Sequence, residues 1–102
     1  MSLRGDNRFS RKDANHEEIV VAYEALYCSV VDLHTVGGGC PDILVGCGGI
    51  SELVEIKTQD GDLEPNQVTF AKHWRGNPVR IVRNDADVES HVKKIRGRLA
   101  RV

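Results

Sequence analysis

The sequence predicts a small α/β domain in which helices cover a mixed β-sheet. Two observations support this fold class. Helical and strand patterns follow one another in the order helix, three strands, helix, strand, helix. The three consecutive strands can form an antiparallel meander, whereas the last strand, reached through a helix, can pair in parallel with a neighbour. The chain has 102 residues, 40% of them hydrophobic and 28% charged, as in one ordinary globular domain.

The chain is expected to have one folded domain, residues 13–102, preceded by a basic flexible arm, residues 1–12. No apolar run approaches the ~18 residues of a membrane span, and the amino terminus lacks the apolar stretch of a secretory signal. The three cysteines are an odd number and too few for a disulfide scaffold. We therefore expect a cytoplasmic protein with no membrane partner.

The first helix is predicted over residues 13–27, with Asp13 or Asn15 as the N-cap. At about 100° per residue, one face of this helix is apolar. Glu18 lies at the edge of that face, whereas Glu17 and Glu24 lie opposite. Among the three acids, Glu18 is therefore the one expected to reach a site on the sheet.

Three strands are predicted next, broken by glycines and proline at the positions where strands end. The glycines at 37–39 end the first strand and match no phosphate-binding loop motif, so we expect no organic cofactor. Pro41 is tolerated at the start of the second strand, and Gly48-Gly49 supplies the positive φ angles of a tight hairpin turn. The predicted strands are 29–36, 42–46 and 51–58.

The second half of the chain predicts a turn, a helix, a strand and a basic helix. Pro65 fits the first turn of a helix that ends near Gly76. Trp74 is interpreted as a core residue at the end of this helix rather than as a platform on which a base stacks. The predicted segments are the turn 59–63, the helix 65–74, the strand 78–83 and the helix 85–98, capped by Asn84 or Asp85.

The hairpin turn fixes which residues face each other. With Gly48-Gly49 as a two-residue turn, Cys47 faces Ile50, and the same register carried outward places Asp42 opposite Glu55. Directly opposed side chains are about 4.5–5.5 Å apart on one sheet face. Lys57, two residues beyond Glu55, points to that same face.

Two opposed carboxylates destabilise a sheet unless another charge offsets them. The neighbouring residues are apolar, so the hairpin is buried and the repulsion is stronger. Lys57 alone could offset the acids as a structural ion pair. A hard divalent cation could also do so, because two carboxylates, a backbone carbonyl and waters suit it as oxygen ligands. The spacing leaves both interpretations open.

These residues resemble the signature of a nuclease superfamily. Pro41-Asp42, followed by Glu55-Ile56-Lys57, is similar to the PD-(D/E)XK motif. The segments GGGCPDILVG and LVEIKT, with Gln67 in the next helix, resemble the VRR-NUC group, including its small stand-alone phage and bacterial members. The resemblance covers roughly residues 15–85. It implies a restriction-endonuclease-like core and a setting in a bacterial cell or a phage-infected host.

The resemblance also implies a Mg²⁺- or Mn²⁺-dependent deoxyribonuclease and assigns roles to six residues. Asp42 and Glu55 would bind the metal together with the backbone carbonyl of Ile56, and Glu18 would support it through water. Lys57 would orient the attacking water and stabilise phosphate charge. Gln67 would hold Lys57 or a phosphate. The chain would then hydrolyse phosphodiester bonds, leaving a 5′-phosphate and a 3′-hydroxyl.

The charge distribution favours a nucleic-acid partner. The net charge of −1 combines +3 in residues 1–12 (four bases, one acid), −10 in residues 13–64 (one base, eleven acids) and +6 in residues 65–102 (nine bases, three acids). An acidic centre between basic ends suits a cation site beside a polyanion. The basic residues expected to contact DNA are Lys93, Lys94, Arg96, Arg98 and Arg101, with Arg8, Arg11 and Lys12 of the arm.

A domain of this size covers few base pairs, so we expect a homodimer. Two active sites would suit branched DNA such as a four-way junction, as the resemblance implies. The alternatives are a catalytically idle DNA-binding module and a structural module on the same fold. The intact Asp42, Glu55 and Lys57 argue against the first, because a pure DNA-binding module does not need an acidic pair facing a phosphate. No long exposed apolar stripe in the sequence favours the second.

Overall fold

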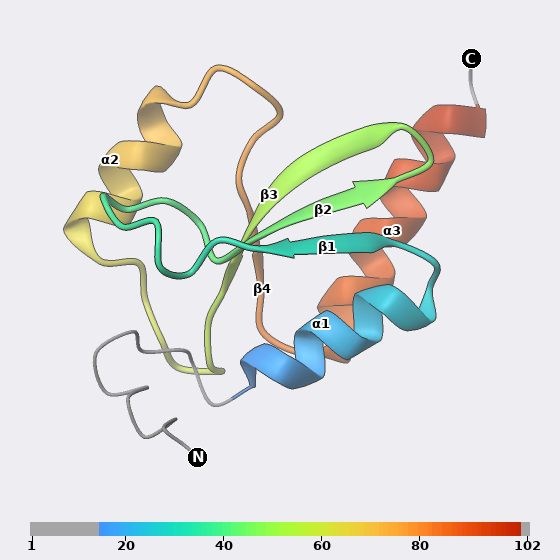
Figure 1. Ribbon diagram of the computed structural model, residues 1–102, viewed down its shortest axis with the longest axis horizontal. Helices are drawn as coiled ribbons and strands as arrows, with labels where there is room; N and C mark the ends of the chain where they lie inside the picture. Colours follow the sequence, from blue (N-terminus) through green and yellow to red (C-terminus); the bar gives the residue numbers. More distant parts are fainter. Residues whose placement is uncertain (1–14, 101–102) are drawn as a thin grey trace.

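The predicted order of elements and the mixed sheet are confirmed (Figure 1). The computed structural model describes residues 15–100, so Asp13 and the predicted arm lie outside it. The sheet order is β1-β2-β3-β4, with β1, β2 and β3 antiparallel and β4 parallel to β3. The elements are α1 His16–Ala25, β1 Ser29–Asp32, β2 Ile43–Cys47, β3 Ile50–Ile56, α2 Pro65–His73, β4 Arg80–Val82 and α3 Asp85–Ala100. Among the described residues, no helix is long and apolar enough to cross a membrane.

The predicted hairpin register is confirmed. Cys47 faces Ile50, and the pairing continues outward to Ile43 opposite Val54. The turn residues Gly48 and Gly49 have φ angles of 61° and 91°, which glycine adopts without steric cost. The two-residue turn therefore determines which side chains share a face of the sheet.

The first strand is shorter than predicted, because the chain turns before the glycines. β1 ends at Asp32, whereas the sequence predicted a strand to residue 36. The Leu33 N–H donates to the Asp42 carbonyl at 2.7 Å, and the Val36 N–H donates to the Leu33 carbonyl at 2.9 Å. The second of these bonds closes a turn over the last residues of the predicted strand. The other predicted element bounds agree with the structure to within three residues.

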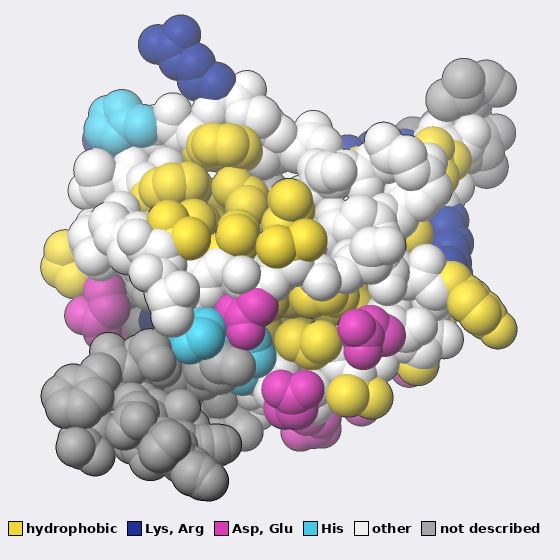
Figure 2. Space-filling model, viewed as in Figure 1, with side chains coloured by type: hydrophobic (Ala, Val, Ile, Leu, Met, Phe, Trp, Pro, Cys, Tyr) yellow, Lys and Arg dark blue, Asp and Glu magenta, His cyan; other side chains and the backbone are white. Residues whose placement is uncertain are grey.

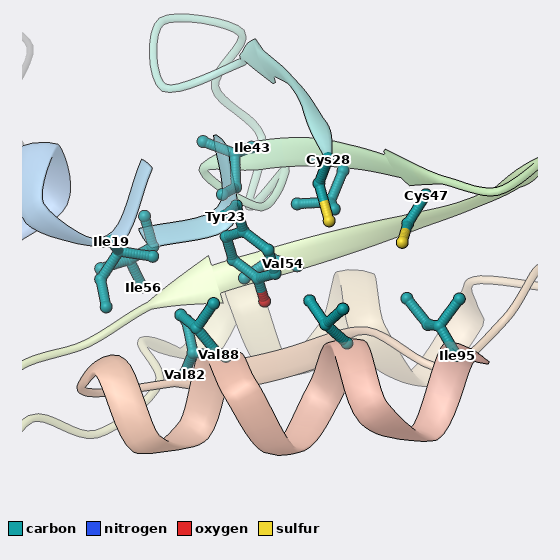
Figure 3. Packing of buried hydrophobic residues seen from close by; sticks show 12 residues of the cluster. Ile19, Tyr23, Cys28, Ile43, Cys47, Val54, Ile56, Val82, Val88 and Ile95 are labelled. Atoms are coloured by element: carbon teal, nitrogen blue, oxygen red, sulfur yellow. The ribbon is translucent and has the colours of Figure 1, made fainter. Parts of the chain in front are cut away.

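The hydrophobic core lies on one face of the sheet, between the strands and the helices α1 and α3. Alternate residues of β2 are buried, and β3 contributes Val54 and Ile56 to the same cluster. Tyr23 of α1 lies between the strands and α3, with its hydroxyl directed toward α3 (Figure 3). Because side chains alternate along a strand, Glu55 and Lys57 project to the opposite face, which α1 and α3 leave uncovered.

The second helix stands apart from α1 and α3, beyond the end of the sheet (Figure 1). Its first turn is closed by a capping box between Glu64 and Gln67, in which the Glu64 N–H donates to Gln67 Oε1 at 2.7 Å. Gly39, with φ 82°, packs against this turn so closely that an added Cβ would lie 2.2 Å from the Asn66 carbonyl oxygen. The glycine segment, residues 37–39, therefore makes a close contact with α2.

A buried chain of side-chain hydrogen bonds crosses the core. It was not predicted from the sequence. His91 Nδ1 lies 2.7 Å from the Tyr23 hydroxyl, and His91 Nε2 lies 2.6 Å from Glu52 Oε1. Arg98 Nη2 donates to Glu52 Oε2 at 2.6 Å. Burial alone would raise the pKa of Glu52, but the bonds from His91 and Arg98 outweigh it and lower that pKa. An ionised Glu52 can only accept hydrogen bonds, so His91 donates to it from Nε2. His91 is then the neutral tautomer whose unprotonated Nδ1 accepts a hydrogen bond from the Tyr23 hydroxyl.

The chain of hydrogen bonds through His91 predicts that acid destabilises the fold. Burial, chiefly, lowers the pKa of His91, so the folded protein keeps this ring neutral to a lower pH than the unfolded chain does. The unfolded ring takes up a proton near pH 6.5, so below about that pH the unfolded state binds more protons and the free energy of unfolding falls. Urea unfolding should show a decrease between about pH 7 and pH 5 that is smaller in His91→Gln. Identical pH profiles for the two proteins would contradict this role.

Candidate active site

Asp42 is fixed at the open end of the β2–β3 hairpin. It follows Pro41, which is fully buried, and precedes the first residue of β2. Its Oδ2 accepts a hydrogen bond from the Ile56 N–H at 2.8 Å. Since Ile43 faces Val54, one further step in the register places Asp42 opposite Glu55. The carboxylate is therefore held across the two strands.

Glu55 is a buried carboxylate in the middle of the site, only 2% exposed. Gln67 Nε2 donates to Glu55 Oε2 at 2.9 Å, and Lys57 Nζ lies 3.8 Å from the same oxygen. A buried charge is strongly destabilising unless it is paired and hydrogen-bonded. The lysine and the glutamine together meet this requirement.

Gln67 connects the second helix to the site through both ends of its amide. Its oxygen accepts the Glu64 N–H, which leaves its nitrogen directed at Glu55. The sequence assigned Gln67 to holding Lys57 or a phosphate. In the structure its hydrogen bond instead reaches the neighbouring carboxylate, so the capping box of α2 also orients Glu55.

Lys57 is enclosed by the loop that follows β3. Its side chain is buried, with the residue 8% exposed, and its backbone N–H donates to the Val82 carbonyl at 3.0 Å. Arg83, which the sequence analysis did not single out, binds this loop: its Nη1 donates to the carbonyls of Thr58 at 2.7 Å and Gly61 at 2.6 Å. An added Cβ at Gly61 would lie 3.6 Å from Lys57 Cδ, so the loop packs along the lysine stem.

Glu18 does not join the other predicted site residues in the described part of the chain. It is exposed on α1, the helix that packs on the opposite sheet face from Glu55, and lines a groove with Asp85. The helical wheel predicted Glu18 at the edge of the apolar face, within reach of the sheet. The side of the helix that meets the sheet, however, carries Ile19 and Tyr23 instead.

The predicted basic residues of the last helix divide into two groups. Lys93, Lys94 and Arg98 line a cavity of about 500 Å³ together with Arg80, a residue that the sequence analysis missed. Arg96 lies outside this cavity, and its guanidinium donates to the Leu26 carbonyl. This basic groove, defined by Arg80, Lys93, Lys94 and Arg98, lies between β4 and α3. The remaining predicted contacts, Arg8, Arg11, Lys12 and Arg101, lie outside the described residues.

The residue types at the site suit magnesium better than a metal ion that must be coordinated by three or more protein side chains. Within residues 15–100, no cluster of three or more His, Cys, Asp or Glu side chains is arranged to hold a metal. Magnesium, however, keeps several waters and is held by one or two carboxylates. The pKa of Cys40 is raised by burial and then by the charges of Glu55 and Asp42, so both carboxylates act on one thiol. Asp42 and Glu55 therefore concentrate negative charge in one place.

Comparisons with known proteins support the fold. No protein-family model and no curated protein matches the chain. A solved structure described as a "VRR_NUC domain" superposes with a TM-score of 0.61 and 24% sequence identity. The match covers 76% of this chain and 89% of that chain. The chain thus has a VRR_NUC-like fold, in agreement with the resemblance carried by its sequence motifs.

The bond between Gln67 and Glu55 predicts a measurable contribution to stability. Gln67→Ala removes the donor from a buried carboxylate, and a hydrogen bond to a charged group contributes about 1.5–3 kcal/mol. Urea unfolding should show a loss in this range. Val68→Ala, at an exposed position of the same helix, is the matched control and should change stability little. Equal stability of Gln67→Ala and the wild type would contradict the assigned contact.

Proposed function

We propose that this chain, which has the fold of a VRR_NUC domain, is a metal-dependent endonuclease that hydrolyses phosphodiester bonds in DNA. The observation that carries the proposal is the pair of opposed carboxylates, Asp42 and the buried Glu55, with Lys57 beside them. A hairpin that served structure alone would be more stable with one of these acids replaced by a neutral residue. A function that needs both negative charges explains why they are together.

The residues of the site divide the chemistry among them. Asp42 and Glu55, with the backbone carbonyl of Ile56, would hold Mg²⁺ or Mn²⁺. When bound, the cation would polarise the phosphodiester and lower the pKa of a water molecule. The Lys57 ammonium would stabilise negative charge that develops on the phosphate during attack. Gln67 keeps Glu55 in one orientation.

The basic groove supports DNA as the polyanionic substrate. Arg80, Lys93, Lys94 and Arg98 bring four positive side chains to one cavity, and Arg98 is also anchored by Glu52. Lysine and arginine neutralise phosphates and release counterions, which drives association with DNA at low salt. We expect this groove to hold the backbone of the DNA while the hairpin acts on the scissile bond.

The proposal has two further elements: the protein is a homodimer, and it is selective for branched DNA. One chain carries one Asp42–Glu55 pair, and two chains related by a twofold axis would direct two such pairs at opposite strands of a junction. An apolar surface is available for such pairing, because the uncovered sheet face includes Val31, 52% exposed, opposite Leu44. Twofold dimers bury the same patch on both subunits.

The role of Lys57 predicts a selective loss of cleavage. In a Mg²⁺-dependent nicking assay, Lys57→Met should reduce the rate by about 100-fold to 1,000-fold, the usual effect of removing one group that stabilises transition-state charge. Methionine keeps the aliphatic stem, so the circular dichroism spectrum and the affinity for DNA should change little. If Lys57→Met unfolds more easily and still cleaves at the wild-type rate, Lys57 is a structural counter-ion and the proposed role is wrong.

The basic groove predicts a steep dependence of DNA affinity on salt. Each phosphate contact contributes about −0.9 to the slope of log affinity against log salt for duplex DNA, so Lys94→Ala should reduce the slope by about one. Arg96→Gln, on the same helix but outside the groove, is the matched control. An unchanged slope in Lys94→Ala would exclude the groove as the phosphate-binding surface.

The dimer and the preference for branches are tested together. Light scattering should give the mass of two chains, and a four-way junction should compete better than a linear duplex of equal length. A monomer that binds both DNAs equally would overturn the homodimer and the preference for branched DNA. The proposed cleavage activity is tested separately by the nicking assay.

A further inference from the structure

Two aromatic rings of the second helix stack on each other at the protein surface. The centroids of Phe70 and Trp74 are 5.5 Å apart, and the ring planes are inclined by 15°. Trp74 is 44% exposed, so the sequence interpretation of this residue as core is wrong. The reason is that α2 lies beyond the end of the sheet, where no other helix covers it (Figure 1).

The rings border a cavity of about 370 Å³ between the second helix and the glycine segment, within the size range of sites for small planar ligands. The position of Trp74 is supported by Gly76, at which an added Cβ would lie 2.7 Å from the indole Nε1. Figure 2 shows hydrophobic side chains gathered between α2 and the strands, with basic and histidine side chains at the upper border. The lining residues are Gly38, Asn66, Thr69, Phe70, His73 and Trp74.

This cavity adjoins the candidate active site through both of its walls. Gln67, which binds Glu55, precedes Phe70 by one helical turn and Trp74 by about two, or about 5 Å and 10 Å along the axis. The opposite wall, at Gly38, belongs to the segment that leads directly to Pro41 and Asp42. A nucleotide next to the scissile bond would therefore lie within reach of the rings.

The charge around the cavity favours a ligand that carries phosphate. Residues 65–78 contain Lys72 and Arg75 and no acidic residue, and His73 lines the cavity itself. Aromatic rings with basic neighbours are the combination that binds single-stranded nucleic acid, because bases stack on the rings while the cations contact the backbone. The bases of a continuous duplex are already stacked in its interior and cannot reach such a surface.

We propose that the Phe70–Trp74 cavity binds an unpaired nucleobase of the DNA beside the cleavage site. The inference rests on the proposed nuclease function and deepens it, because it names the feature of the substrate that the site recognises. Strands with unpaired nucleotides, such as a flap or an open junction, would bind in preference to a continuous duplex.

Trp74 is the only tryptophan of the chain, so its fluorescence reports on the cavity directly. The full chain is titrated in EDTA, which prevents cleavage, with a thymidine oligonucleotide and with an abasic oligonucleotide of equal length. Quenching by the first and little quenching by the second is the expected result, since both ligands carry the same phosphates. Equal quenching by the two oligonucleotides would overturn the proposal.

Substitution provides the second arm of the test. Trp74→Ala should weaken binding of the thymidine oligonucleotide, measured by fluorescence anisotropy of a labelled strand, by about 5-fold to 150-fold, the usual contribution of one stacked base. Trp74→Phe should recover most of the loss, and Val68→Ala on the same helix should match the wild type. Unchanged affinity in Trp74→Ala, or a change in its mass that identifies the surface as a contact between copies, would overturn the proposal.

The two proposals fail in distinguishable ways, because the binding measurements need no metal. Base-dependent quenching without any cleavage in Mg²⁺ supports the cavity and contradicts the nuclease function. Cleavage with equal quenching by both oligonucleotides supports the nuclease function and contradicts the cavity.

Discussion

The burial of the Glu55 carboxylate is the constraint on which the arrangement of this protein depends. A carboxylate that is 2% exposed needs partners, and it has them only if β3 and α2 are placed correctly relative to each other. Lys57 directly follows β3, but Gln67 comes from α2, which stands apart from α1 and α3 (Figure 1). The capping box at Glu64 and the close contact of Gly39 with Asn66 hold that helix in position.

The two faces of the sheet differ in the side chains that they carry. On one face, α1 and α3 bury the apolar side chains and the chain of hydrogen bonds from Tyr23 through His91 to Glu52. The other face, which α1 and α3 do not cover, carries Glu55 and Lys57, and there α2 contributes Gln67 to the site. The proposed base-binding cavity extends this open side along α2 and gives the helix that orients Glu55 a second use.

The register of the hairpin and its carboxylate pair were predictable, because a two-residue glycine turn allows one pairing and side chains alternate along strands. Contacts between distant segments were not predictable in this way. Arg83 binds the loop after Lys57, and Glu52 meets Arg98, across separations that no local pattern records. Glu18 was misjudged for a related reason: a helical wheel identifies the apolar face but not the direction in which that face docks. The exposure of Trp74 depended on where α2 lies, which its own sequence does not encode.

The central claim is that Asp42 and Glu55 together form a cation site, and thermal unfolding with and without Mn²⁺ tests it most directly. In the wild type, Mn²⁺ at about a hundredfold excess over its dissociation constant should add about 2.7 kcal/mol of stability. Asp42→Asn should abolish this gain, yet without metal it should be at least as stable as the wild type, because the repulsion falls and the amide oxygen can still accept the Ile56 N–H. An equal gain with Mn²⁺ in both proteins, or a large loss of stability in metal-free Asp42→Asn, would contradict the account.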